Sequence, residues 1–164
     1  STKKIFRNKE NLITYMPRKK FDHLQKLLFI LKQHLPSNWK VNSIDNVPES
    51  EVARLLQKSK IFLSFSELEG FGLPPLEAAL CGNSVVGYTG ESGKEYWTQP
   101  IFDEVYSGDL RTYANKIINK VKDFNKDENF SNKFETQINQ LTEKYSMEKE
   151  EQSLLPLINL IKDI

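Results

Sequence analysis

Short apolar segments of strand length alternate with amphipathic helical patterns through the first two thirds of the chain, and this alternation restricts the fold more than any other feature. The strand-like segments are rich in β-branched or aromatic residues and lie at residues 12–16, 61–64 and 84–88, with a weaker one at 40–44. Helical patterns separate them. Such alternation is typical of a parallel sheet covered by helices on both faces, so the sequence predicts an α/β fold.

Three helices are predicted between these strands. The first carries an apolar stripe at spacings of three and four, formed by Phe21, Leu24, Leu27, Leu28, Leu31 and Leu35. The second follows Pro48, a residue suited to a first helical turn, and contains Val52, Leu55 and Leu56. The third is short and is expected at 75–81, because Pro75 disfavours helical geometry at Pro74, with Gly82 as its left-handed stop.

The last third of the sequence is helical in pattern. Amphipathic helices are predicted at 110–124, 130–145 and 154–164, and Pro156 is expected to start or kink the last one. A chain of 164 residues fits one domain, here residues 1–164, with a helical C-terminal tail. The apolar segment 154–164 also suggests a homodimer formed through the C-terminal helices.

Composition excludes several classes of protein. A net charge of +1 gives no overall basic field, so nucleic acid is not an expected partner. With Cys81 as the one cysteine and His23 and His34 as the histidines, neither a disulfide framework nor a metal cluster is expected. No apolar run is long enough to cross a membrane, and no secretory signal opens the sequence. We therefore expect a cytoplasmic piece of a larger protein.

Ligands of parallel α/β sheets bind beyond the carboxyl ends of the strands, here the loops after residues 16, 44, 64 and 88. The loop after 64 is the densest motif, a strand end followed by Gly70, Gly72 and a helix. A glycine loop at a helix N-terminus suits a phosphate. Because Pro74 and Pro75 have no N–H, the donors are expected from the glycine loop and from Leu76 or Glu77.

Two glutamates bracket this loop. Glu69 precedes the glycines, and Glu77 is expected in the first turn of the helix. From the residues alone, Glu77 could simply complement the helix dipole and Glu69 could be a solvated loop acid.

The run from Ser66 to Gly82 resembles the donor-binding signature E-G-F-G-L-P-x-x-E of the retaining group 1 glycosyltransferases of GT-B architecture. The match covers both glutamates, both glycines, Phe71, Leu73 and Pro74, and the flanking order agrees from about Leu12 to Trp97. The resemblance implies the Rossmann-like C-terminal half of such an enzyme, with the N-terminal acceptor domain absent and the enzyme cytoplasmic or peripheral to a membrane. It implies that the isolated half transfers nothing.

The resemblance also implies roles for individual residues. Glu69 would be the catalytic residue beside the transferred sugar, and Glu77 would accept hydrogen bonds from the ribose hydroxyls of a nucleotide diphosphate sugar. Backbone groups at Gly70, Phe71, Gly72 and Leu73 would hold the sugar and the diphosphate. The family needs no metal or other cofactor, so positive side chains must neutralise the diphosphate.

Basic residues follow the first strand, and Arg18 with Lys20 or Lys19 is predicted to contact the diphosphate. Many members of the family have an Arg and a Lys several residues apart here, opened by a glycine, whereas this chain has a compressed Pro-Arg-Lys-Lys without glycine. The alternative is a solvated basic start of the helix.

The loop after 88 contains Gly90 and Gly93, followed by Lys94. It is not an ATP-binding P-loop, because Tyr88 and Glu95 stand where that motif needs a glycine and a hydroxyl residue. Gly90 is predicted to offer backbone contacts to the donor.

Two other functions remain open at this point. One is a binding or interaction module that keeps the fold without catalysis; the other is a glycoside hydrolase with Glu69 and Glu77 as its acid and base. His23 and His34 are expected to be surface or end-capping residues, and Cys81 a small buried one. Tyr96 and Trp97 are expected to pack under the fourth loop.

Overall fold

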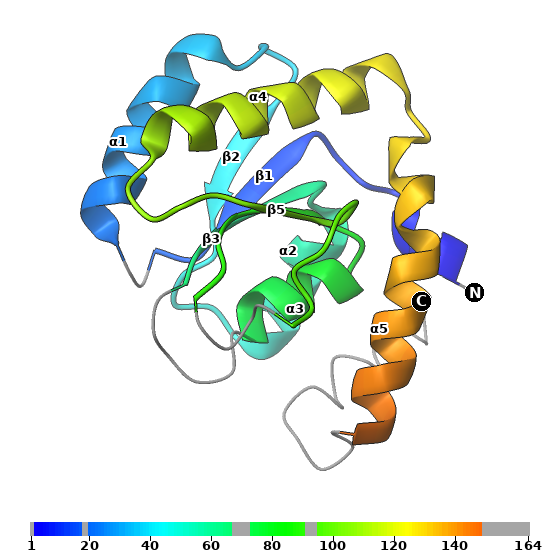
Figure 1. Ribbon diagram of the computed structural model, residues 1–164. Helices are drawn as coiled ribbons and strands as arrows, with labels where there is room; N and C mark the ends of the chain where they lie inside the picture. The colour runs from blue at the N-terminus through cyan, green and yellow to red at the C-terminus, as the bar shows by residue number, and fades with distance from the viewer. Residues whose placement is uncertain (1, 18–19, 67–72, 91–94, 149–164) are drawn as a thin grey trace.

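A computed structural model describes residues 2–17, 20–66, 73–90 and 95–148 and is built around a five-stranded parallel sheet (Figure 1). The strands are β1 (Leu12–Tyr15), β2 (Lys40–Ser43), β3 (Ile61–Phe65), β4 (Ser84–Tyr88) and β5 (Phe102–Glu104). Their order across the sheet is β2-β1-β3-β4-β5, and every neighbouring pair is parallel. The predicted Rossmann-like α/β fold is confirmed.

Burial explains which strands the sequence reveals most clearly. All five residues of β3 and of β4 are buried, as expected for central strands with helices on both faces. The edge strand β2 is largely exposed and polar, which matches its weak sequence signal. The other edge strand, β5, was not predicted, because Phe-Asp-Glu is too short and too polar to form a recognisable pattern.

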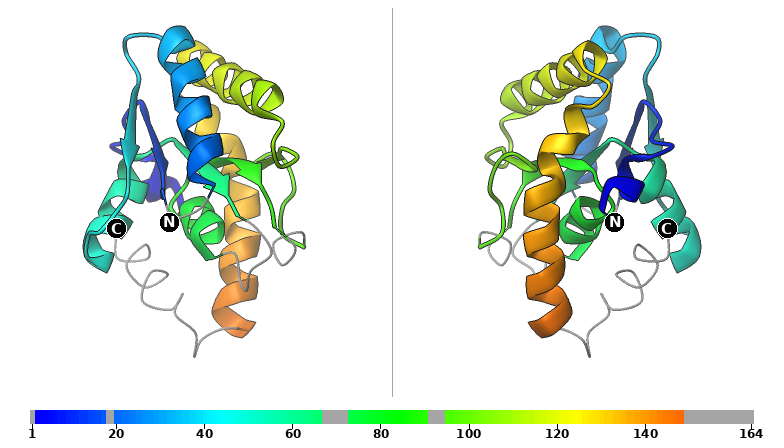
Figure 2. Two further views of the ribbon diagram at one scale, coloured as in Figure 1. Left: turned by 90° about the vertical axis from the view of Figure 1, so that its left-hand side faces the viewer. Right: turned by 90° about the vertical axis from the view of Figure 1, so that its right-hand side faces the viewer.

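Helices cover the sheet in two layers (Figures 1 and 2). Helices α1 (Phe21–His34) and α4 (Leu110–Lys126) pack against each other on one face. The other face carries α2 (Glu49–Lys58) and α3 (Leu73–Leu80), with α5 (Glu135–Glu148) beside α3. Short 3-10 helices, η1 (Thr2–Phe6) and η2 (Phe130–Phe134), pack against α5 and against each other. Helices on both faces are therefore confirmed.

Two predicted helix boundaries are wrong. Helix α3 begins at Leu73 rather than at Pro75, because Pro74 and Pro75 both fit into a first turn, where helical residues need no N–H of their own. The predicted 130–145 helix is divided into η2 and α5. The stop at Gly82 is confirmed, since its φ is +89° and its N–H bonds Ala79 O at 2.9 Å.

Nothing in the described part of the chain is a helix long and apolar enough to cross a membrane. The segment 154–164, for which a helix and a dimer contact were predicted, lies outside the described residues.

The carboxyl ends of β3 and β4 are joined through the side chain of Tyr113 from α4. Its buried hydroxyl lies 2.7 Å from the carbonyl oxygen of Ser64 and 3.1 Å from that of Val86. Gly87 makes room for this contact, because a Cβ there would lie 2.1 Å from Ser64 O and 2.3 Å from the Tyr113 hydroxyl oxygen. The Ser64 hydroxyl adds a hydrogen bond to Tyr88 O at 2.7 Å. Residue 87 must therefore be glycine.

Lys9 joins the ends of two helices near the amino ends of the strands, opposite the Tyr113 contact. Its Nζ donates to the carbonyl oxygens of Leu56 (3.1 Å), Ser59 (2.7 Å) and Cys81 (2.5 Å), which lie at the ends of α2 and α3. The negative ends of the helix dipoles favour the ammonium. Burial acts against it more strongly and lowers the pKa of Lys9 to about 7.

We expect the Gly87→Ala variant to lose more than about 3 kcal/mol of unfolding free energy. Its added methyl group would clash with the Ser64 carbonyl and the Tyr113 hydroxyl, and alanine would be strained at the positive φ of this position. Urea denaturation measures the loss. Gly108→Ala is the matched control, since Gly108 also has a positive φ but the nearest atom to its Cβ position is 4.0 Å away. A similar loss in both variants would show that backbone strain, and not the contact with Tyr113, requires glycine at 87.

Lys9 should make stability depend on pH. Its folded pKa of about 7 lies below the ordinary 10.5, so above pH 7 the unfolded chain binds more protons than the folded one. The free energy of unfolding should therefore rise from pH 7 to 9 more steeply in the wild type than in Lys9→Met. Urea titrations at pH 7, 8 and 9 compare the slopes, and equal slopes would mean that Lys9 stays charged in the fold.

Candidate functional site

The candidate site lies where the order of the strands reverses. In the order β2-β1-β3, the chain leaves β1 through α1 on one face and leaves β3 through α3 on the other. Ligands of doubly wound sheets bind in the crevice at such a switch point. The loops that diverge here are the basic loop after β1 and the glycine loop after β3, so the topology brings these two sequence motifs to one edge.

Several of the predicted site residues lie outside the described residues. These are Arg18 and Lys19 of the first loop and Glu69, Gly70, Phe71 and Gly72 of the third. Their contacts remain predictions. The residues that flank them are placed, and these fix where each loop leaves and re-enters the fold.

Lys20 closes the first loop. It has left-handed backbone angles (φ 51°, ψ 42°) and immediately precedes α1, and its carbonyl accepts from Leu24 N at 2.9 Å. Because α1 starts at the carboxyl edge of the sheet, a partly buried lysine stands at the positive end of a helix, next to the switch point. This position suits an anion.

Glu77 lies two residues further into α3 than predicted. Since the helix begins at Leu73, Glu77 starts its second turn and is half-buried, next to Leu76 and Ala78, which are buried. Leu76 closes the first turn, whose N–H groups have no partner within a helix, whereas the N–H of Glu77 can bond to the carbonyl of Leu73. The expected donation from Leu76 or Glu77 to a ligand stays a prediction. Among the described residues of the first turn, Leu73 has an N–H, whereas Pro74 and Pro75 have none.

The fourth loop is held by β5. Gly90 has a positive φ of 67°, and the hydroxyl of the preceding Thr89 lies 3.0 Å from Glu104 Oε2 and 2.9 Å from Gly90 O. Tyr96 and Trp97 pack against Phe102 of β5, with ring centroids 5.3 and 5.1 Å from it. The residues that flank this loop, Thr89 after β4 and Tyr96 and Trp97 before β5, therefore contact the edge strand β5.

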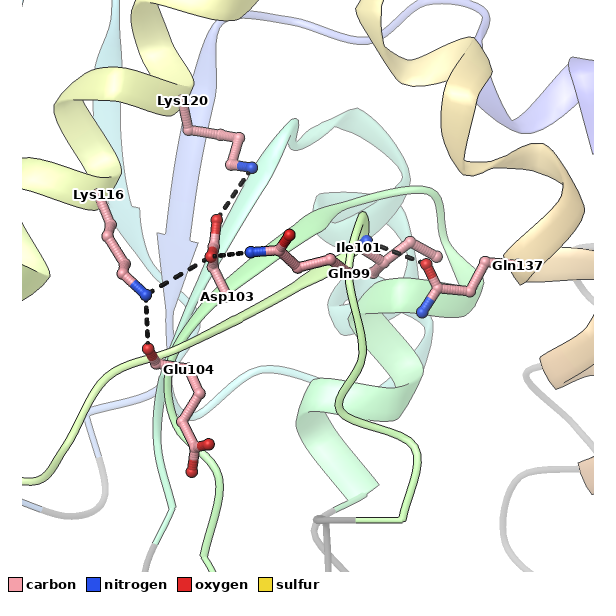
Figure 3. Close-up of polar contacts among 7 residues, drawn as sticks. All are labelled: Gln99, Ile101, Asp103, Glu104, Lys116, Lys120 and Gln137. Atoms are coloured by element: carbon pink, nitrogen blue, oxygen red, sulfur yellow. Dashed lines mark hydrogen bonds and ion pairs between the residues drawn. The ribbon is translucent and has the colours of Figure 1, made fainter.

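Asp103 and Glu104, adjacent on β5, have different tasks (Figure 3). Asp103 pairs with Lys120 at 3.1 Å and Lys116 at 3.6 Å, and it accepts from Gln99 Nε2 at 3.1 Å. Burial raises the pKa of Asp103, but attraction to these lysines outweighs it and the pKa falls below its usual range. The carboxylate of Glu104 points away from this cluster, toward the fourth loop. Asp103 therefore holds α4, and Glu104 supports the candidate site.

His23 was expected at the surface and is instead half-buried. Its Nδ1 lies 3.0 Å from the hydroxyl oxygen of Tyr88, at the end of β4. The helical pattern placed His23 on the polar side of its helix, next to Asp22, but it could not show that the start of α1 lies beside the end of β4. His34 is exposed, as predicted.

The buried cysteine is not suited to act as a nucleophile. Cys81 is fully buried, as predicted, and burial raises the pKa of its thiol to about 12, so it stays protonated. Within the described ranges no three His, Cys, Asp or Glu side chains gather as metal ligands would.

Comparison with known proteins agrees with this geometry. Residues 23–140 match the family model described as "Glycosyl transferases group 1". The chain is 31% identical over 107 residues to an alpha-1,6-glucosyltransferase of Actinobacillus pleuropneumoniae serotype 7 (strain AP76), an alignment that covers 63% of this chain and 32% of that protein. It thus spans about a third of this relative's length.

Solved structures share the fold. TarM aligns with a TM-score of 0.64 at 20% identity, over 93% of this chain and 36% of that one. A mutant of S. aureus TarM in complex with Fondaparinux, alpha-GlcNAc-glycerol and UDP aligns with a TM-score of 0.67 at 19% identity, over 92% and 36%. The GtfA/B complex gives 0.61 at 15% identity, over 96% and 38%. With a family model that covers most of the chain and a sheet whose switch point carries the family's signature loop, this protein belongs to the group 1 glycosyltransferases.

Proposed function

We propose that this chain is the nucleotide-sugar-binding half of a retaining, metal-independent glycosyltransferase that moves a sugar from a nucleotide diphosphate sugar to an acceptor. The observation that carries the proposal is the placement of the two elements that the signature loop connects. This loop leaves β3 at the switch point of the sheet and enters α3, which carries Glu77. A loop in this place can present its backbone and both of its acids to one ligand.

Glu77 is proposed to bind the ribose. A carboxylate accepts hydrogen bonds from two neighbouring hydroxyls at once, and its half-buried setting in α3 limits the competition from water. Glu69, at the other end of the loop, is proposed to orient the transferred sugar and to stabilise the positive charge that develops at its anomeric carbon.

The diphosphate is proposed to lie between the first and third loops. Lys20 stands beside the N-terminus of α1, and Arg18 and Lys19 precede it in the sequence. Amides at Gly70, Phe71, Gly72 and Leu73, with Gly90 opposite, would complete the donor contacts. Side-chain cations carry most of the neutralisation here, because the two prolines of α3 remove amides that a helix start normally offers.

The similarities suggest which donor to try first. One relative is an alpha-1,6-glucosyltransferase, and UDP is present in the TarM complex. We therefore propose a UDP-hexose such as UDP-glucose. The acceptor would be bound by an N-terminal domain, since GT-B enzymes react between two domains and this chain supplies one.

Nucleoside diphosphates should stabilise the chain against heat. Binding of UDP at about 100 times its Kd adds roughly 2.7 kcal/mol of apparent stability, and GDP and ADP serve as comparisons.

Glu77→Ala should weaken UDP binding by about 1–3 kcal/mol, because the hydroxyl contacts are lost, whereas Glu69→Ala should leave it nearly unchanged. Titration calorimetry that gives the opposite ranking would overturn these roles.

The chain alone should bind UDP-glucose without transferring its sugar. In the two-domain enzyme, Glu69→Ala should abolish turnover while UDP affinity persists. Release of UDP over time measures the turnover of the isolated chain and of the two-domain variant. Rapid sugar transfer by the 164-residue chain would contradict the proposed division between donor and acceptor domains. A two-domain enzyme that binds UDP-glucose but never turns it over would favour a binding module without catalysis.

A further inference from the structure

Three segments meet at the hydroxyl of Tyr88. His23 Nδ1 from α1 and Gly108 N from the turn before α4 both lie 3.0 Å from this oxygen, and Tyr88 is itself the last residue of β4. We call the contact among His23, Tyr88 and Gly108 the Tyr88 junction. It joins segments that are 65 and 20 residues apart from Tyr88 in the sequence.

The hydroxyl is held in place by its ring. Tyr88 is 2% exposed, and its ring packs edge-on against Phe65 (centroids 5.6 Å apart), Tyr113 (5.4 Å) and His23 (5.8 Å). These aromatic neighbours fix the ring from β3, from α4 and from α1. A phenol fixed in this way can hold a partner in one position, which an exposed side chain cannot do.

The hydrogen bonds fit together with each group used once. Gly108 N–H donates to the Tyr88 oxygen, and with the Nε2–H tautomer of His23 the Tyr88 hydroxyl donates to His23 Nδ1. Burial raises the pKa of Tyr88 above its usual range, while the Gly108 amide and the positive charge of Lys20 act in the opposite direction. The phenol therefore keeps the proton that this arrangement needs.

The junction lies between two of the loops proposed to bind the donor. Lys20 comes three residues before His23, and Thr89 and Gly90 come directly after Tyr88. We infer that the Tyr88 junction positions the first and fourth loops relative to each other, so that Lys20 and Gly90 face one diphosphate sugar; His23 and Tyr88 are thus positioning residues. The inference rests on the proposed function, which supplies the ligand.

The test removes each partner of the junction and keeps the packing. Tyr88→Phe deletes the hydroxyl but not the ring, and His23→Ala deletes the imidazole, whereas His23→Asn keeps a polar atom near the position of Nδ1. Tyr106→Phe and His34→Ala are the matched controls, because both side chains are exposed and neither is part of the junction. Ile117→Val, a small change in the buried face of α4, controls for a general loss of stability.

The variants are compared by two measurements on the whole chain, UDP affinity and the NMR order parameters of backbone amides. Tyr88→Phe and His23→Ala should each weaken UDP binding about fivefold by calorimetry, as expected for one lost hydrogen bond. They should also lower the NMR order parameters of the Phe21 and Gly90 amides without UDP. His23→Asn should restore both values toward wild type, and the three control variants should change neither.

The two proposals fail in different ways. If the wild type binds UDP and the order parameters and affinities of the junction variants match those of the controls, the Tyr88 junction has no positioning role while the proposed function stands. If the wild type binds no nucleoside diphosphate, the proposed function fails. The order parameters then decide whether the junction holds the two loops, and unchanged values at Phe21 and Gly90 would overturn it.

Discussion

The structure depends on the close parallel pairing of β3 and β4 at their carboxyl ends. Five registered pairs, from Ile61 with Ser84 to Phe65 with Tyr88, join two strands that are buried along their whole length. At the end of this ladder Tyr113 reaches over Gly87 to the Ser64 carbonyl, so α4 is fixed to both strands at once. Both the signature loop and the fourth loop leave the sheet from this point. Their starting positions are therefore set by two strands that are buried along their whole length.

The two edges of the sheet differ in what their polar groups do. At the amino edge, Lys9 satisfies carbonyls at the ends of α2 and α3, and Asn83 donates to Leu56 O and Ala78 O. These contacts join helices to each other. At the carboxyl edge, Glu104 contacts Thr89 of the fourth loop, and the Tyr88 hydroxyl contacts His23 of α1 and Gly108 of the turn before α4. The polar groups of the amino edge therefore join helix ends, whereas those of the carboxyl edge hold the segments that surround the candidate site.

Much of this arrangement could be predicted from the sequence, and the failures have specific physical reasons. Burial requires continuous apolar runs in β3 and β4 and apolar residues at spacings of three and four in α1, and both patterns can be recognised in the sequence. The start of α3 was misplaced because the rule for residues before proline was applied to a first turn, where Pro74 is tolerated. The half-buried position of His23 depends on the start of α1 lying beside the end of β4. No local pattern encodes such a placement, since it follows from the strand order.

The proline pair at the start of α3 has a consequence for how an anion is held. Helices usually meet phosphates with a row of fixed amide dipoles, and Pro74 and Pro75 interrupt that row. In the proposed site, lysine and arginine charges would replace the missing donors, and such charges are hydrated and exchange with dissolved ions. Such a site exchanges geometric selectivity for long-range attraction, so its grip on a doubly charged leaving group weakens as the ionic strength of the surrounding solution increases.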